Sequence, residues 1–161
     1  MLIIIEILHN LPLIAALLGI LIAQLVKIPI HFIATREIDW GLFTSTGGMP
    51  SSHSAAVSAL TTAIAFENGL SSSLFAIAAI FSVIVMFDAT GIRYQAGQQA
   101  IVINQMRKDF QTFIIKAKAL PEKSGEEKIE ELKTLLGHRP IEVFFGCLTG
   151  IILSTLLYTL F

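Results

Sequence analysis

The sequence is poor in charged residues, and this scarcity argues against an ordinary soluble domain. Only 14% of the 161 residues are Asp, Glu, Lys or Arg, whereas 54% are hydrophobic. The mean hydropathy of +0.75 is correspondingly high for a globular protein. A net charge of −1 provides no excess of basic residues, so we expect no nucleic-acid partner. The composition predicts a single membrane-embedded domain over residues 1–161.

Cysteine pairs and compact metal-binding motifs are also missing. The single cysteine, Cys147, excludes an intrachain disulfide and lies in an apolar run, where it indicates packing. A metal site built from Asp88, Glu142 and the histidines is conceivable, but the sequence contains neither HExxH nor paired CxxC. We therefore expect neither a metal nor another cofactor.

The first 24 residues contain no Lys or Arg, and their apolar stretch is too long for a cleaved signal peptide. We expect a retained membrane span there. Four apolar segments are candidates for crossing the bilayer, which takes about 20 mostly apolar residues each. They are approximately Leu11 to Val26, Ser54 to Phe66, Leu70 to Phe87, and Ile141 to Phe161. We predict an all-α helical bundle of about four transmembrane helices.

The second candidate span is short and rich in Ser and Thr, so we expect it to lie among other helices. The alternative is a buried helix that does not span. A polar insertion over about 88–139 keeps helical periodicity: Ile103, Met106, Phe110 and Phe113 share one face, as do Ile129, Leu132 and Leu136. It predicts one or two amphipathic interfacial helices on the bilayer or on the bundle.

The basic residues are distributed asymmetrically. All eleven Lys and Arg residues fall between Lys27 and Arg139, and with four spans the connections that hold them lie on one side. The opposite side receives both termini and the turn at 67–69. By the positive-inside rule we expect both termini outside and the basic side in the cytoplasm. The same topology brings distant polar residues to one interface, which indicates a site.

Two histidines at predicted helix starts are the central candidates. His138 precedes the last apolar helix, and Pro140 in the first turn would let Glu142 reach back to it. A carboxylate on one ring nitrogen fixes the tautomer and raises the basicity of the other, so His138 is the candidate nucleophile. The alternative for Glu142 is helix capping without chemistry.

His53 follows Gly48, Ser51 and Ser52 at the start of the second apolar helix. The glycine softens the turn, and helix N-termini favour anions, so the two hydroxyls could bind a phosphate. Capping of the helix by these serines is compatible with that role. A protonated His53 could donate a proton to a leaving oxygen, so we predict a general acid.

A phosphoryl group also needs cations around its oxygens. The basic residues nearest the predicted helix ends are Lys27, Arg36, Arg93 and Arg139, of which Arg93 is favoured. Lys27 has an alternative interpretation, in which it snorkels from the end of the first span. Asp88 is expected to pair with Arg93 or with Lys27.

Three segments of the sequence resemble the divergent branch of the PAP2 superfamily, which is related to acid phosphatases and vanadium haloperoxidases. They are GGMPSSHSA at 47–55, DATGIRYQAGQQ at 88–99 and LLGHRPIEV at 135–143. Mainstream members carry KxxxxxxRP, PSGH and SRxxxxxHxxxD. The resemblance implies that His138 attacks phosphorus, that His53 acts as the acid and that the basic residues bind phosphate.

The chain departs from the mainstream motifs at several positions. Lys27 precedes Arg36 by nine positions instead of seven, and Glu37 stands in place of the proline that follows. Leu132 occupies the position of the arginine in the third motif, and Arg93 is the candidate that supplies its charge from another helix. Without that charge, the set of phosphate-binding cations would be incomplete.

The resemblance and the residues together favour a membrane phosphatase that acts on a lipid phosphate or pyrophosphate through a phosphohistidine. The alternative is a membrane protein that binds phosphate or lipid phosphate without catalysis, as a scaffold or transport component. A haloperoxidase is a more distant alternative. Membrane lipid is the expected environment, and the apolar surface of four spans would also suit a homo-oligomer.

Overall fold

The computed structural model describes residues 6–118, 132 and 136–160, and the described part of the chain is α-helical with no strand. Its elements are α2 (Leu11–Thr35), the short 3-10 helix η1 (Trp40–Thr44), α3 (Ser52–Asn68), α4 (Ser73–Thr90), α5 (Ile92–Lys118) and α6 (Pro140–Leu160). Three helical stretches are long and apolar enough to cross a membrane: Leu11–Thr35, Ser73–Ile114 and Pro140–Leu160. The prediction of an all-α membrane protein is confirmed.

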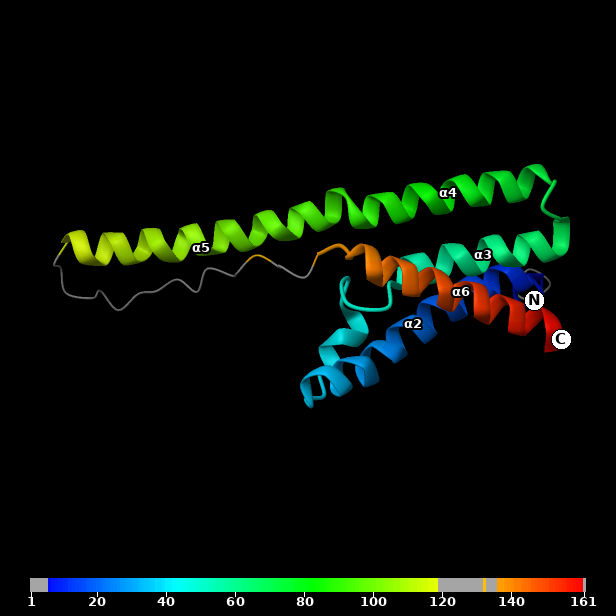
Figure 1. The fold of residues 1–161 in the computed structure, drawn as a ribbon, viewed down its shortest axis with the longest axis horizontal. Helices are drawn as coiled ribbons and strands as arrows, with labels where there is room; N and C mark the ends of the chain where they lie inside the picture. Colours follow the sequence, from blue (N-terminus) through cyan, green and yellow to red (C-terminus); the bar gives the residue numbers. More distant parts are fainter. Residues whose placement is uncertain (1–5, 119–131, 133–135, 161) are drawn as a thin grey trace.

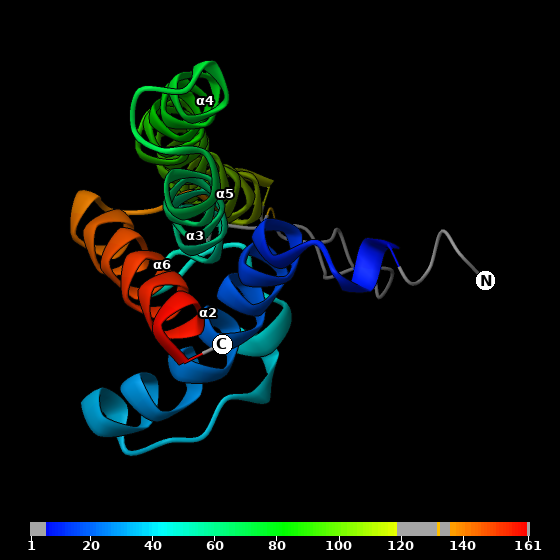
Figure 2. The ribbon, with the colours of Figure 1, turned by 90° about the vertical axis from the view of Figure 1, so that its right-hand side faces the viewer.

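Helix α3 lies at the centre of the bundle, in contact with α2, α4 and α6 (Figure 2). Its 17 residues would extend about 26 Å, somewhat less than the thickness of a hydrocarbon core of about 30 Å. Its buried side chains are mostly small: Ser52, Ser54, Ala55, Val57, Ser58, Ala59 and Ala63. The segment expected to sit among other helices therefore does so.

Glycines let α6 approach α3 closely. A Cβ atom on Gly150 would lie 2.2 Å from the carbonyl oxygen of Ala55, and one on Gly146 would lie 2.4 Å from that of Ser51. Backbone atoms cannot yield as a flexible side chain could, so a larger residue would force the two helices apart. Gly146 and Gly150 have the GxxxG spacing that is typical of packed transmembrane helices.

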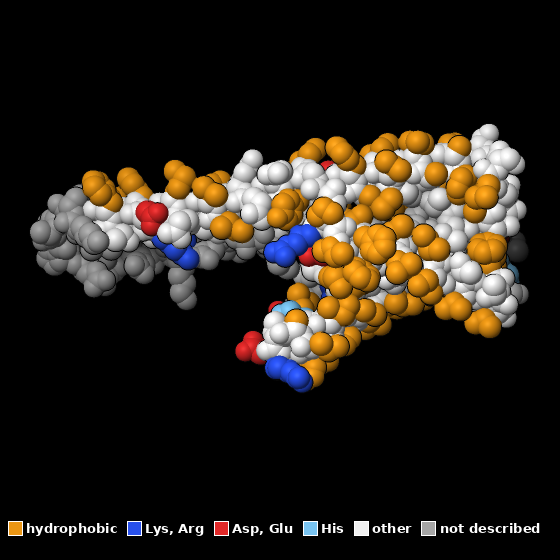
Figure 3. Space-filling model, viewed as in Figure 1, with side chains coloured by type: hydrophobic (Ala, Val, Ile, Leu, Met, Phe, Trp, Pro, Cys, Tyr) orange, Lys and Arg blue, Asp and Glu red, His pale blue; other side chains and the backbone are white. Residues whose placement is uncertain are grey.

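The chain breaks at Gly91 between α4 and α5, yet α5 continues in nearly the direction of α4 (Figure 1). Helix α5 therefore projects beyond the end of the bundle. The sequence instead predicts that helices of the polar insertion lie on the bilayer or on the bundle. Its apolar residues Ile103, Met106, Phe110 and Phe113 are exposed. Hydrophobic side chains follow the outer edge of this projecting helix in Figure 3.

The second amphipathic helix expected within the insertion, around 124–136, falls almost entirely outside the described residues. One point of the returning chain is described. The backbone of Leu132 forms two hydrogen bonds with the side chain of Asn104 on α5, with N···Oδ1 at 3.2 Å and Nδ2···O at 3.0 Å. Residue 132 is thus held against the middle of α5.

The two ends of the bundle differ. The start of α2 and the end of α6 lie at one end (Figure 1). The starts of α3 and α6 and the junction between α4 and α5 lie at the other. Those three segments carry the motif residues, so the fold gathers them at one end of the bundle, as the topology predicted.

Candidate functional site

His138 is placed by contacts of its own backbone. The preceding Gly137 has a φ of +75°, and a Cβ atom there would lie 2.2 Å from the backbone nitrogen of Tyr94. Only glycine fits so close to the α4–α5 junction in this conformation. The backbone N–H of His138 donates to the carbonyl of Ala89 at 2.9 Å. The imidazole itself is 2% exposed.

The His138 ring is held on one side only. Its Nδ1 lies 3.0 Å from Oε2 of Glu142, which also accepts the backbone N–H of Arg139 at 3.3 Å. Among the described residues, Nε2 is buried and has no hydrogen-bond partner. With Nδ1–H donated to the carboxylate, Nε2 carries the free electron pair. The contact expected between Glu142 and His138 is present, and it both orients the ring and caps α6.

His53 faces the same ring from the first turn of α3. The two imidazole centroids are 6.2 Å apart with an interplanar angle of 60°. His53 lies outside the three spanning stretches, and burial lowers its pKa below the usual 6.5. Electrostatic interactions with His138, Arg93 and Lys27 lower this pKa further, whereas Asp88 raises it. The predicted convergence of the two histidines is therefore observed.

Ser51 and Ser52 are both buried, at 0% and 5% exposure. Ser51 Oγ accepts the backbone N–H and the hydroxyl of Ser54 at 3.3 and 2.9 Å, so it caps α3. Its backbone N–H donates to the carbonyl of Glu142 at 2.9 Å and thereby joins the starts of α3 and α6. Neither serine lines the cavity beside the histidines. The capping role is thus visible, and the phosphate-binding role stays a prediction.

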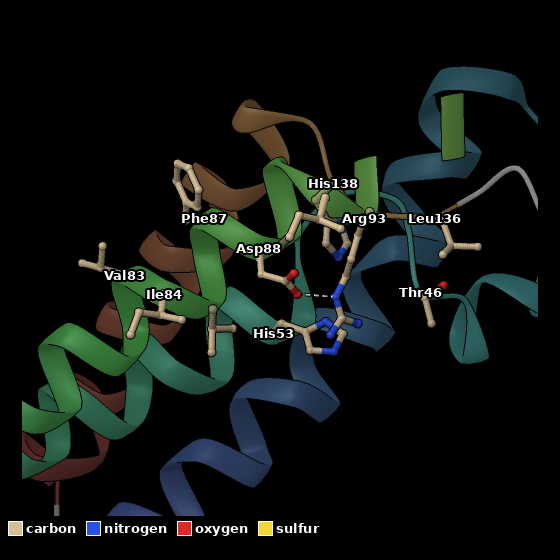
Figure 4. Close-up of a pocket in the computed structure, with 13 residues that line it drawn as sticks. Thr46, His53, Val83, Ile84, Phe87, Asp88, Arg93, Leu136 and His138 are labelled. Carbon is tan, nitrogen blue, oxygen red and sulfur yellow. Dashed lines mark hydrogen bonds and ion pairs between the residues drawn. The ribbon is translucent and has the colours of Figure 1, made fainter. Parts of the chain in front are cut away.

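Arg93 lies in the first turn of α5 and reaches toward the histidines from the α4–α5 junction (Figure 4). Its Nε donates to Oδ2 of Asp88, in the last turns of α4, at 2.5 Å. The two side chains are 53% and 37% exposed. Of the two partners expected for Asp88, the structure therefore pairs it with Arg93, and the guanidinium retains other N–H donors for a ligand.

Lys27 lies within the bundle. Its side chain is 2% exposed, and its Nζ donates to the carbonyl of Ser45 at 3.1 Å. Gly48, with a φ of +89°, lies against the stem, since a Cβ atom there would be 3.8 Å from Lys27 Cδ. The alternative in which Lys27 snorkels to the interface is therefore wrong. Lys27 and Gly48 instead hold the turn that leads into α3.

Arg36 and Arg139 lie apart from the histidines. Arg36 caps the end of α2 in a left-handed conformation, is exposed, and lies about 13 Å along the helix axis from Lys27. Arg139 is exposed and lines a separate cavity of about 200 Å³ beside Tyr94 and Glu142. Of these two and the other predicted phosphate-binding cations, Arg93 is the one that lines the cavity next to the histidines.

That cavity has a volume of about 640 Å³ and two kinds of wall. His53, Asp88, Arg93 and His138 form its polar end (Figure 4). An apolar wall is formed by side chains of α4 and of the first residue of α5: Val83, Ile84, Val85, Phe87 and Ile92. This apolar wall cannot be assigned to the site from the sequence, because every residue of an apolar span could equally face lipid. Within the described ranges, no group of three His, Cys, Asp or Glu residues is placed to hold a metal ion.

The fold and the site define a small helical membrane protein with two histidines at one end of the bundle. The model of the divergent PAP2 family matches residues 8–153, so the chain belongs to this family. It is 59% identical over 152 residues to the Uncharacterized membrane protein YuiD of Bacillus subtilis (strain 168). The aligned residues make up 94% of this chain and 96% of that relative. No solved structure matches the chain. The resemblance carried by the three motifs is confirmed.

Proposed function

We propose that this protein is a membrane phosphatase that cleaves a lipid phosphate or pyrophosphate through a phosphohistidine at His138. One observation carries the proposal above all others. The imidazole of His138 is buried, its Nδ1 is held by Glu142, and its Nε2 has no partner among the described residues. An unpartnered buried nitrogen is costly in a structural residue, whereas a nucleophile requires one.

The reaction proceeds in two steps. Nε2 of His138 attacks phosphorus, the bond between phosphorus and the leaving oxygen breaks, and protonated His53 gives its proton to that oxygen. Water then attacks phosphorus, the N–P bond breaks, and His53 takes up the proton that the water loses. Acid help of this kind contributes typically about 10²–10⁴ in rate. The N–H groups of Arg93 stabilise the charge on the transferred phosphoryl group.

The cavity supports a lipid as the substrate. Its polar end suits a phosphate, and its α4 wall suits an apolar chain. Phe87 and Ile92, which line that wall, are 75% and 74% exposed on the outside of the bundle. A ligand with an apolar chain therefore reaches the histidines sideways from the bilayer. The asymmetry of the basic residues supports a site that faces the cytoplasm, with both termini outside.

A second function, binding of a lipid phosphate without turnover, is favoured by a specific feature. Leu132 stands where the mainstream third motif has an arginine, and its backbone is held against α5. Among the residues that the structure describes, Arg93 then provides the single guanidinium at the cavity. A pocket with fewer cations can still hold a phosphate while it stabilises the transition state poorly.

The test is release of inorganic phosphate from a panel of lipid phosphates and pyrophosphates by the purified protein in mixed micelles. His138→Ala should abolish release and leave thermal unfolding in detergent unchanged. The matched control is His31→Ala, which removes a half-buried histidine of α2, away from the cavity, that contacts Thr35 and the backbone of Glu37 and should retain full activity. Equal turnover by the wild type and by His138→Ala would overturn the phosphatase. Vanadate binding without turnover on the whole panel would select the binding function.

Glu142→Gln sharpens the same test. A glutamine can keep the cap on α6 but stabilises the imidazolium far less, and it permits the other tautomer. We expect the rate of phosphate release to fall by at least about 100-fold with little change in stability. An unchanged rate would reduce Glu142 to its capping role.

A further inference from the structure

The connection between α2 and α3 exposes large apolar side chains outside any spanning helix. Ile38, Trp40 and Phe43 are 58%, 73% and 40% exposed. Trp40 and Phe43 belong to η1, and Ile38 lies two residues before its start. In water this 38–43 segment would present a patch of apolar surface on a loop, which is unfavourable unless something covers it.

The polar backbone groups of this segment find partners nearby. Asp39 Oδ1 accepts the N–H of Gly41 at 2.8 Å, and the N–H of Ser45 donates to the carbonyl of Leu42 at 3.2 Å. The hydroxyl of Thr44 donates to the carbonyl of Gly41 at 3.3 Å. Backbone that approaches the membrane interior must satisfy its hydrogen bonds within the protein, and these bonds meet part of that requirement locally.

The segment is also tied to the spanning helix α2. Both Nζ of Lys27 and Nε2 of Gln24 donate to the carbonyl of Ser45, at 3.1 and 3.5 Å. Near the end of α2 that leads into the segment, Phe32 and Ile33 are also exposed, at 40% and 75%. In Figure 1, η1 lies at the end of the bundle where α3 and α6 begin.

We propose that the 38–43 segment anchors the protein in the membrane interface of the leaflet that the histidine site faces. Trp40 then lies at the boundary between headgroups and acyl chains, where an amphipathic aromatic ring is favoured. The flanking charges of Arg36, Glu37 and Asp39 have both signs, so binding does not depend on anionic lipid. The segment runs directly into the turn that precedes Ser51, and the anchor therefore sets the depth of the site. It is independent of whether the site is catalytic.

The chain contains a single tryptophan, so its fluorescence reports Trp40 alone. The protein is reconstituted in phosphatidylcholine vesicles that carry bromine either near the headgroup or near the end of the acyl chain. We expect blue-shifted emission, a larger loss of fluorescence with bromine near the headgroup, and little quenching by aqueous iodide. The result should be the same when anionic phosphatidylglycerol is added.

Two variants calibrate the measurement. In a Trp40→Phe background, Phe43→Trp should repeat the wild-type pattern, because both residues belong to η1. In the same background, Phe81→Trp on the exposed side of α4 should be quenched more by bromine near the chain end. Three outcomes for Trp40 overturn the proposal: strong quenching by iodide without bromolipid quenching, protection from both quenchers, or the deep pattern of Phe81→Trp. Protection from both would point to cover by a second copy of the chain.

Discussion

The contact of α3 with α6 and the junction of α4 with α5 bring residues to the same cavity in different ways. Between α3 and α6, glycines allow backbone to meet backbone, and Ser51 bonds directly to Glu142. At the α4–α5 junction, Asp88 and Arg93 form an ion pair whose side chains are 53% and 37% exposed for the arginine and the aspartate. The difference shows that His138 and Glu142 are fixed by close packing, whereas Arg93 is held by an ion pair open to solvent.

The tightly packed side should be the more sensitive to substitution. Gly150→Leu places a side chain where a Cβ atom alone would lie 2.2 Å from the carbonyl oxygen of Ala55. We expect the free energy of unfolding, measured by denaturant titration in detergent, to fall by about 3 kcal/mol or more. The matched control is Ile152→Leu at a position of α6 that is 50% exposed, and it should change stability by less than about 0.5 kcal/mol. Equal stabilities for the two variants would contradict the close approach of α6 to α3.

Substitutions at the solvent-exposed α4–α5 junction should leave the fold intact and change the affinity for a ligand. Arg93→Ala removes a charged donor from the cavity, so vanadate should bind about 10–100-fold more weakly. Asp88→Asn leaves the guanidinium in place and removes a partly exposed ion pair, so the loss should be at most about fivefold. Arg36→Ala is the control and should bind vanadate like the wild type. If Arg36→Ala weakened binding as much as Arg93→Ala, the assignment of the cation would be wrong.

The smallest expected effect concerns pH. A general acid must be protonated. Burial lowers the pKa of His53 below 6.5, and electrostatic interactions with His138, Arg93 and Lys27 lower it further, whereas Asp88 partly offsets this effect. For the free enzyme, kcat/KM should therefore decrease as the pH rises through a value below 6.5. Arg93→Gln removes one of the positive charges and should move this decrease to higher pH by a fraction of a unit. A decrease that sets in only above pH 7 would exclude His53 as the acid.

Sequence reasoning predicted the helices and the meeting of the two histidines because both follow from chain topology. Helix spacing also placed Glu142 on the same side as His138. It did not predict the direction of Lys27, since a long side chain at the end of a span can turn inward or outward. It placed the helix that follows Asp88 on the bilayer or on the bundle, whereas α5 projects beyond the bundle (Figure 1), because the direction of α5 depends on the backbone at Gly91.

Other features were present in the sequence without being decisive. Gly146 and Gly150 have the spacing of a helix-packing pair, which would have identified the face of α6 that meets α3. The apolar wall of the cavity on α4 carries no comparable signal, because side chains that face lipid and side chains that face a ligand have the same composition. Gly137 reads as a helix stop, and only the structure shows that it lies against Tyr94.

The central position of α3 bears on how the protein is made. Because its surface is rich in Ser and Ala, α3 by itself has only a weak tendency to move from the translocon into lipid. The glycines that cover it belong to α6, which leaves the ribosome after α2, α3, α4 and α5. A nascent chain arrested before residue 138 therefore holds His53 without His138 or Glu142, and the pocket is completed only after these earlier helices have been made.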